Sequence, residues 1–306
     1  MANSDSPIAI LDSGLGGLTV ARAVHALLPH ERMIYFGDTA RLPYGSKTAA
    51  TVTTFVKQII AHLKPHNPKH VVIACNTATA LALPAIKKEF PDLTITGVVE
   101  PGAKAAVAAA GSKQFPSIGI IATEATIRSK AYDRSILRRR HHARLLLRPT
   151  PLLVPMIEEG RNSDDPLVLL GLREYLSPMM KHGIDVLVLG CTHYPILRRS
   201  IQVLVGPDVA VIDSAEQCAQ DVARRLESAK LLRGDGSSEN GNGDGAGNGD
   251  GANHHPAGIT HCFVTDDSPR FARLAERFLG TKITAPTCVC PDELYNGVVA
   301  SIQEQS

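Results

Sequence analysis

The sequence lacks several features that would assign it to a specialised class. No apolar stretch approaches the roughly 18 to 20 residues of a membrane-spanning helix, and the opening MANSDSPIAILD lacks a basic segment followed by a long apolar one. Only 6 of the 306 residues are cysteine, too few for a disulfide scaffold, which predicts free thiols. The formal net charge of +2 provides no global field that would favour nucleic acid or an anionic membrane as a partner. We therefore expect a cytoplasmic protein with a small-molecule substrate.

The residues that are present suffice for a packed core. Hydrophobic residues make up 44% of the chain and charged residues 20%, which excludes wholesale disorder. Short apolar runs alternate with helical patterns, and such runs are typical of parallel strands buried on both faces. The sequence therefore predicts an α/β, doubly wound fold. The expected strands cover residues 8–11, 33–36, 71–74, 94–99, 117–122, 145–147, 186–189, 209–212 and 260–265.

A faint internal repeat predicts two similar lobes. The segment VVIACNTATA around Cys75 has a counterpart in VLVLGCTHYP around Cys191, 116 residues later. The strand before Asp12 likewise matches the strand before Thr123, 111 residues later. Because ligands of open parallel sheets bind beyond the carboxyl ends of the strands, we expect two pseudo-symmetric lobes with the active site between them. The predicted boundaries are 1–99 plus 213–306 for the first lobe and 100–212 for the second.

A segment of different composition interrupts the first lobe. Residues 234–258 are rich in Gly, Asn and Asp and cannot bury a core, so we expect a flexible loop. Its aspartates lack the ligand order of an EF-hand calcium loop. Cys288 and Cys290 form a C-x-C pair rather than the common C-x-x-C spacing of zinc sites. We therefore predict no metal.

A glycine-rich turn follows the first expected strand. Asp12 precedes SGLGG, whose glycines permit a tight turn with backbone N–H groups facing an anion at the start of a helix. Asp38 follows the second strand at the place where an acidic residue could hold a ribose. However, the turn does not complete G-x-G-x-x-G, because Thr19 occupies the last position. A carboxylate or phosphate is therefore favoured over a nicotinamide cofactor.

Two thiols at matching repeat positions are the central chemical feature. A single buried cysteine is usually inert packing, but Cys75 and Cys191 both follow buried strands and would face one ligand from opposite sides. Two opposed thiols suit the removal and return of a proton at a stereocentre. A nearby cation or helix N-terminus lowers the pKa of a thiol and makes it a useful base. Asp12 and His193 are placed to shuttle a proton or to tune these thiols.

Several motifs in order carry a family resemblance. The segments AILDSGLGGLTV, YFGDTARLPYG, ACNTATA, GVVEPG, VPMIEEG and LGCTHYP resemble those of glutamate racemases, in the aspartate/glutamate racemase family. The resemblance covers most of the chain. It implies an isomerase that interconverts L- and D-glutamate without a cofactor and supplies D-glutamate for peptidoglycan and cell-wall biogenesis. It also implies a homodimer.

The resemblance assigns roles to individual residues. It implies that Cys75 acts on the D-enantiomer and Cys191 on the L-enantiomer, with Asp12, His193 and Glu158 assisting. Together with the strand-end positions, it predicts a set of substrate-binding residues. These are Asp12, Ser13, Pro43, Tyr44, Gly45, Ser46, Asn76, Thr77, Thr123, Thr126, Thr192 and His193.

Two other functions stay open. A mechanism with two opposed bases does not depend on the length of the substrate's side chain, so aspartate or another amino acid is an alternative substrate. The basic run from Arg138 to Arg144 is expected to be a solvated helix end. Because some glutamate racemases are associated with inhibition of DNA gyrase, the competing interpretation is a regulator that binds gyrase or nucleic acid through this run.

Overall fold

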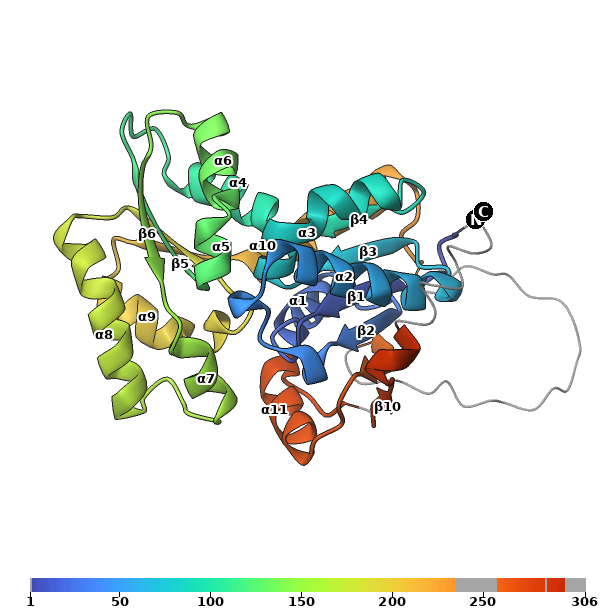
Figure 1. The fold of residues 1–306 in the computed structure, drawn as a ribbon. Coiled ribbons are helices and arrows are strands. Elements are labelled where there is room, and N and C mark those ends of the chain that lie inside the picture. The colour runs from blue at the N-terminus through green and yellow to red at the C-terminus, as the bar shows by residue number, and fades with distance from the viewer. Residues whose placement is uncertain (1, 235–257, 284, 295–306) are drawn as a thin grey trace, which may run out of the picture.

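The computed structural model describes residues 2–234, 258–283 and 285–294, and they form two parallel β-sheets flanked by helices (Figure 1). The first sheet has the strand order β10-β9-β2-β1-β3-β4 and the second the order β6-β5-β7-β8. The strands of the first sheet are β1 (Ile8–Asp12), β2 (Met33–Gly37), β3 (His70–Ile73), β4 (Ile95–Gly97), β9 (Ile259–Val264) and β10 (Thr287–Cys288). Those of the second are β5 (Ser117–Ala122), β6 (Arg144–Pro149), β7 (Val186–Gly190) and β8 (Ala210–Asp213).

Helices connect the strands and cover the sheets (Figure 1). Several begin at a side chain that accepts a hydrogen bond from the first turn, as Thr48, Asp165 and Asp213 do. The first six helices are α1 (Leu18–Leu27), α2 (Ala49–Leu63), α3 (Asn76–Glu89), α4 (Val99–Ala109), α5 (Glu124–Arg128) and α6 (Ala131–Arg139). The others are α7 (Leu153–Glu158), α8 (Pro166–Lys181), α9 (Arg198–Val205), α10 (Ser214–Ser228) and α11 (Pro269–Leu279). Short 3-10 turns are η1 (Thr39–Arg41), η2 (Tyr44–Ser46), η3 (Lys64–His66) and η4 (Tyr194–Leu197).

The internal repeat is visible in the order of the strands. The block β2-β1-β3-β4 of the first sheet corresponds strand for strand to β6-β5-β7-β8 of the second, and the pairings within both blocks are parallel. The carboxyl ends of β3 and β7 are thus equivalent positions in two similar lobes. This confirms the predicted α/β class with two doubly wound parallel-sheet lobes. The residue boundaries predicted for the lobes remain predictions.

The nine predicted strands are all present, with two differences in detail. Burial on both faces holds for central strands such as β1 and β7, but β6, at the edge of its sheet, is only partly buried. The short strand β10 was not predicted, because its two exposed residues carry no apolar run. The predicted flexible loop at 234–258 lies outside the described residues except for its two ends.

A buried ion pair ties three segments of the first lobe together. The Lys69 ammonium, just before β3, pairs with the Glu31 carboxylate at 2.5 Å, and both side chains are almost completely buried. Lys69 also donates to the carbonyl of Leu231, after α10, while Glu31 accepts from the backbone N–H of Arg233. A charge left alone here would be costly, so the pair holds these segments in register.

The basic run behaves as a helix end that bonds to its own lobe. Arg138 and Arg139 at the end of α6 both pair with Glu100 of α4, and Arg140 donates to the carbonyl of Gly111. Within the described ranges, no helix combines the length and apolar character needed to cross a membrane.

Candidate active site

One cavity of about 380 Å³ lies between the lobes, and thirteen of the predicted site residues line it. Both lobes contribute: the turns after β1, β2 and β3 come from the first, and the turns after β5, β6 and β7 from the second. The predicted residues in the lining are Ser13, Pro43, Tyr44, Gly45, Ser46, Cys75, Asn76, Thr77, Thr123, Glu158, Cys191, Thr192 and His193. The two thiols therefore share a single cavity.

Two predicted residues lie behind this lining. Asp12 is fully buried at the end of β1, where one carboxylate oxygen accepts from the N–H of Gly14 at 3.0 Å. Its other oxygen, Oδ1, has no hydrogen-bond partner. Thr126 is also buried, and its hydroxyl is hydrogen-bonded to those of Thr77 and Thr123. Both residues support the site from behind.

Cys75 lies between β3 and α3, at the position that caps the helix. Its Sγ accepts from the N–H of Ala78 at 3.4 Å. Burial and then the neighbouring Asp12 carboxylate raise the pKa of Cys75 to about 12, although hydrogen bonds from Ser13 and Ala78 oppose the shift. At Cys75, desolvation therefore outweighs the hydrogen bond from the first turn of α3.

Cys191 has different partners at the equivalent position after β7. Its Sγ is 3.8 Å from Nδ1 of His193, whose Nε2 is 3.0 Å from a carboxylate oxygen of Glu158. Burial alone would lower the pKa of His193, but its hydrogen bonds and charge interactions with Cys191 and Glu158 raise it to about 10. His193 is consequently an imidazolium at neutral pH and places a positive charge beside the Cys191 sulfur.

Asp12 completes the contrast between the two sides of the cavity. Burial raises the pKa of its carboxyl group, while the His193 charge and backbone N–H groups oppose that rise. An acidic residue thus neighbours Cys75, whereas a cation neighbours Cys191. The two repeat-related thiols therefore have chemically unequal surroundings.

The lobes touch one another around the cavity. The hydroxyl of Thr77 in the first lobe is 2.9 Å from that of Thr123 in the second, and Thr19 donates to the carbonyl of Thr192 at 3.0 Å. A Cβ added at Gly16 would lie 2.1 Å from the Thr192 hydroxyl, a distance that no real contact allows. Glycine at position 16 is therefore required for this close approach.

One supporting residue was missed by the sequence reasoning. Its position after β2 indicates Asp38 only as a ribose ligand, but Asp38 is fully buried and accepts from the hydroxyl of Tyr44. It also accepts from Arg41 Nε at 2.8 Å and from the Thr265 hydroxyl at 2.9 Å. The Tyr44 hydroxyl is thus engaged with Asp38, which fixes the η2 turn in the cavity wall. The motif YFGDTARLPYG contained these residues, but only the fold shows the link to Thr265.

The second lobe contributes further lining to which the sequence analysis assigned no role. Val154 and Pro155 lie on α7 within the motif VPMIEEG, and Thr150, outside the motifs, follows β6; all three are in the wall of the cavity. In the described part of the chain, no three His, Cys, Asp or Glu side chains form a group suited to a metal ion. The polar groups in the lining include thiols, an imidazole, carboxylates and hydroxyls.

Known proteins resemble this chain over nearly its whole length. A family model described as Asp/Glu/Hydantoin racemase matches residues 18–222. A glutamate racemase of Geobacter metallireducens is 43% identical over 276 residues, covering 90% of this chain and 93% of the relative. A glutamate racemase of Thermus thermophilus is 40% identical over 294 residues, covering 96% of this chain and 100% of the relative.

Solved structures agree with the sequence matches. Glutamate racemase from Francisella tularensis in complex with D-glutamate superposes with a TM-score of 0.80 at 33% identity, covering 94% of this chain and 98% of that chain. The enzyme from Thermus thermophilus in complex with β-chloro-D-alanine gives a TM-score of 0.77 at 40% identity, covering 95% and 100%. The fold, the paired thiols and these matches define a racemase, and the chain belongs to the Asp/Glu/hydantoin racemase family. The relatives that it matches end to end are glutamate racemases, which are isomerases.

Proposed function

We propose that this protein is a glutamate racemase that interconverts L- and D-glutamate with two cysteines as opposed acid and base. The observation that carries the proposal is that Cys75 and Cys191 follow equivalent strands of two similar lobes and line one cavity. A pair related in this way can reach one carbon from both faces. The names of the end-to-end relatives indicate the substrate.

The proposed reaction transfers one proton at each sulfur. From L-glutamate, the Cys191 thiolate takes the α-proton, and the electron pair of the broken C–H bond stays on the α-carbon. The thiol of Cys75 then donates its proton to the opposite face, which forms D-glutamate. Cys191 ends as a thiol and Cys75 as a thiolate, so the reverse reaction restores the starting state.

The unequal surroundings of the thiols support this division of labour. The His193 imidazolium, held by Glu158, lies beside Cys191, on the side where the proposed reaction takes the proton from L-glutamate. On the other side, burial and Asp12 raise the pKa of Cys75 to about 12, which keeps this group protonated and ready to donate. In this proposal Asp12, the neighbour of Cys75, assists the return step at that thiol.

The lining suits a small amino acid with two carboxylates. A cavity of about 380 Å³ lies in the usual size range for small-ligand sites. Among its described lining residues there is no Lys or Arg, so the substrate carboxylates would be held by hydroxyls and amides. Groups from both lobes can serve, including Ser13, Asn76, Thr77, Thr123 and Thr192.

Circular dichroism tests the proposal directly. Purified protein incubated with D-glutamate should abolish the optical signal as the solution becomes racemic, and D-aspartate run in parallel should keep its signal. A constant signal with D-glutamate across pH and protein concentration rejects the proposal. Equal loss with both acids would replace glutamate specificity by a broader amino-acid racemase.

Two further properties follow from the same proposal. D-glutamate made by this reaction would supply peptidoglycan synthesis, so depletion of the protein should make cells depend on added D-glutamate. The protein is further proposed to be a homodimer, which sedimentation with and without glutamate would test. A strictly monomeric protein that remained active would reject the dimer alone.

A further inference from the structure

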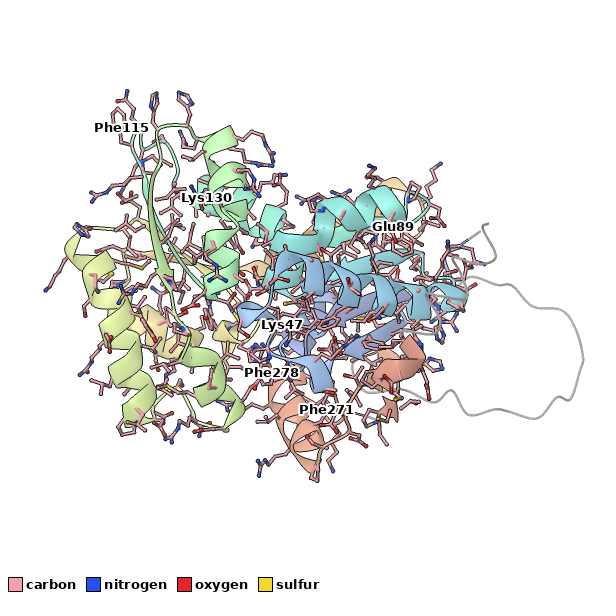
Figure 2. The ribbon with its side chains drawn as sticks, viewed as in Figure 1. Lys47, Glu89, Phe115, Lys130, Phe271 and Phe278 are labelled. Carbon is pink, nitrogen blue, oxygen red and sulfur yellow. The ribbon has the colours of Figure 1, made fainter. Side chains whose placement is uncertain are left out.

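Helix α11 lies against the catalytic side chains of the opposite lobe. It follows β9 of the first sheet, yet its last turn reaches α7 of the second lobe (Figure 1). Figure 2 labels Phe278 at the end of α11 that faces the centre of the molecule. Two neighbouring residues of this turn make the contacts. Phe278 packs against His193, and Arg277 bonds to the backbone on either side of Glu158, the partner of His193.

Arg277 holds the backbone on both sides of Glu158. Its guanidinium donates to the carbonyl of Ile157 at 3.4 Å and to that of Arg161 at 2.5 Å. Ile157 lies in the last turn of α7, where its carbonyl also accepts from the N–H of Gly160 at 3.0 Å, and Arg161 follows the end of the helix. A charged donor with a fixed planar fork bonds to both carbonyls at once and restrains the turn between them. The backbone that carries Glu158 is therefore fixed from the first lobe.

Phe278 supports the other member of the pair. Its ring is fully buried and meets the His193 ring edge to face, with centroids 5.2 Å apart and an interplanar angle of 80°. This contact restricts rotation of the imidazole about its axis. Among the described residues that line the cavity, neither Arg277 nor Phe278 is found, so neither can touch the substrate.

We propose that the last turn of α11 positions the His193–Glu158 pair beside Cys191, through Arg277 and Phe278, and so sets the rate of proton transfer at Cys191. The inference rests on the proposed racemase function. Arg277 and Phe278 are positioning residues in this account. The opposite thiol, Cys75, takes its hydrogen bonds in the described part of the chain from Ser13 and Ala78 rather than from α11, so we expect the effect on one side of the reaction.

The groups facing His193 decide what a disturbance would do. Cys191 and Glu158 favour the imidazolium, and the Asp12 carboxylate also interacts with its charge. If the end of α7 drifts, Glu158 moves away from His193 and the imidazolium becomes less stable. The cation beside Cys191 is then lost at lower pH, which slows the step at Cys191 but leaves Cys75 in place.

The test replaces Arg277→Met, which removes the donors and keeps an apolar stem. We expect kcat to fall about 10- to 100-fold with a much smaller change in KM, as for supporting groups whose loss misplaces a catalytic side chain. The alkaline limb of the pH–rate profile should move to lower pH. Arg277→Lys should restore part of kcat. The matched control is Arg273→Met at an exposed site on the same helix, which should behave as wild type.

Deuterium at the α-carbon separates positioning from general damage. If the Cys191 step becomes slower, the primary isotope effect should rise for deuterated L-glutamate and fall for deuterated D-glutamate. Loss of activity with equal isotope effects on both enantiomers and an unshifted pH profile would overturn the inference. So would a folded Arg277→Met protein with wild-type kcat.

A second variant covers the case in which Arg277→Met does not fold. Phe278→Leu keeps the apolar filling but removes the ring edge from His193, and it should show the same asymmetric isotope effects. Wild-type behaviour of this variant would then overturn the inference. If wild type racemises glutamate and the variants match it, only the role of α11 is refuted. If wild type itself is inactive, the proposed function is refuted.

Discussion

Replacing Glu158 by Gln tests the electrostatic state of the site most sharply. The side chain keeps its size and can still accept a hydrogen bond from His193 Nε2, now 3.0 Å from the carboxylate. It loses the negative charge that stabilises the imidazolium. In the intact site the pKa of His193 is raised from 6.5 to about 10, a preference for the charged form on the order of 5 kcal/mol. Cys191 and Glu158 share this stabilisation.

The size of the effect follows from removing one of those two partners. An opposite charge at this range shifts a pKa by about 1 to 3 units. We therefore expect the alkaline limb of the kcat profile of Glu158→Gln to move down by about 1 to 2 pH units. At neutral pH, below the lowered pKa, the rate should change little, whereas near pH 10 it should fall about 5- to 50-fold, because far fewer molecules carry the imidazolium beside Cys191.

The assay is the rate of loss of optical signal from each enantiomer between pH 6 and 10, measured on Glu158→Gln and on wild type. Glu174→Gln, at an exposed position on α8, is the matched control and should be indistinguishable from wild type. An alkaline limb at the wild-type position in Glu158→Gln would refute the role given to the imidazolium.

Three other predictions concern packing and stability. Gly16→Ala should lower kcat/KM strongly in a folded protein, because its Cβ would lie 2.1 Å from the Thr192 hydroxyl. The control Gly171→Ala, whose Cβ meets nothing closer than 3.7 Å, should keep wild-type activity. Equal kinetics of the two variants would disprove the need for close approach at Gly16. The pKa of His193 is higher in the folded than in the unfolded protein, so its contribution to stability is full below pH 6.5 and is lost as the pH rises through about 10. Thermal melts over that pH window should therefore show a larger loss of stability for wild type than for His193→Gln. Lys69→Met should cost about 3 to 5 kcal/mol in urea denaturation by leaving a buried carboxylate without its partner, and an unchanged midpoint would contradict that.

The regular part of the fold could be read from the sequence because it depends on local pattern. Apolar runs between helical segments specify buried parallel strands, and the offset between Cys75 and Cys191 disclosed the repeat that the strand orders confirm. The sequence did not predict the edge strand β10, because its two exposed residues carry no such pattern. Partial exposure of β6 also depends on its place in the sheet, which the sequence does not contain.

Much of the candidate site could be anticipated for a related reason. Residues at the carboxyl ends of parallel strands converge, so the predicted site residues make up most of the lining. Contacts between distant segments could not be anticipated. The bond from Thr265 to Asp38 joins residues 227 apart in the chain, and Arg277 meets α7 across the lobes. Nor could the raised pKa of Cys75 be foreseen, because burial depends on the complete fold.

The central claim is that two thiols in one cavity act on opposite faces of the same carbon. The most direct measurement is the racemisation rate of glutamate by folded Cys75→Ala and Cys191→Ala proteins, each started from both pure enantiomers. Each variant should lose at least about 10²- to 10⁴-fold in rate in both directions, since every conversion needs both sulfurs. Conversion at close to the wild-type rate by either variant would contradict the account.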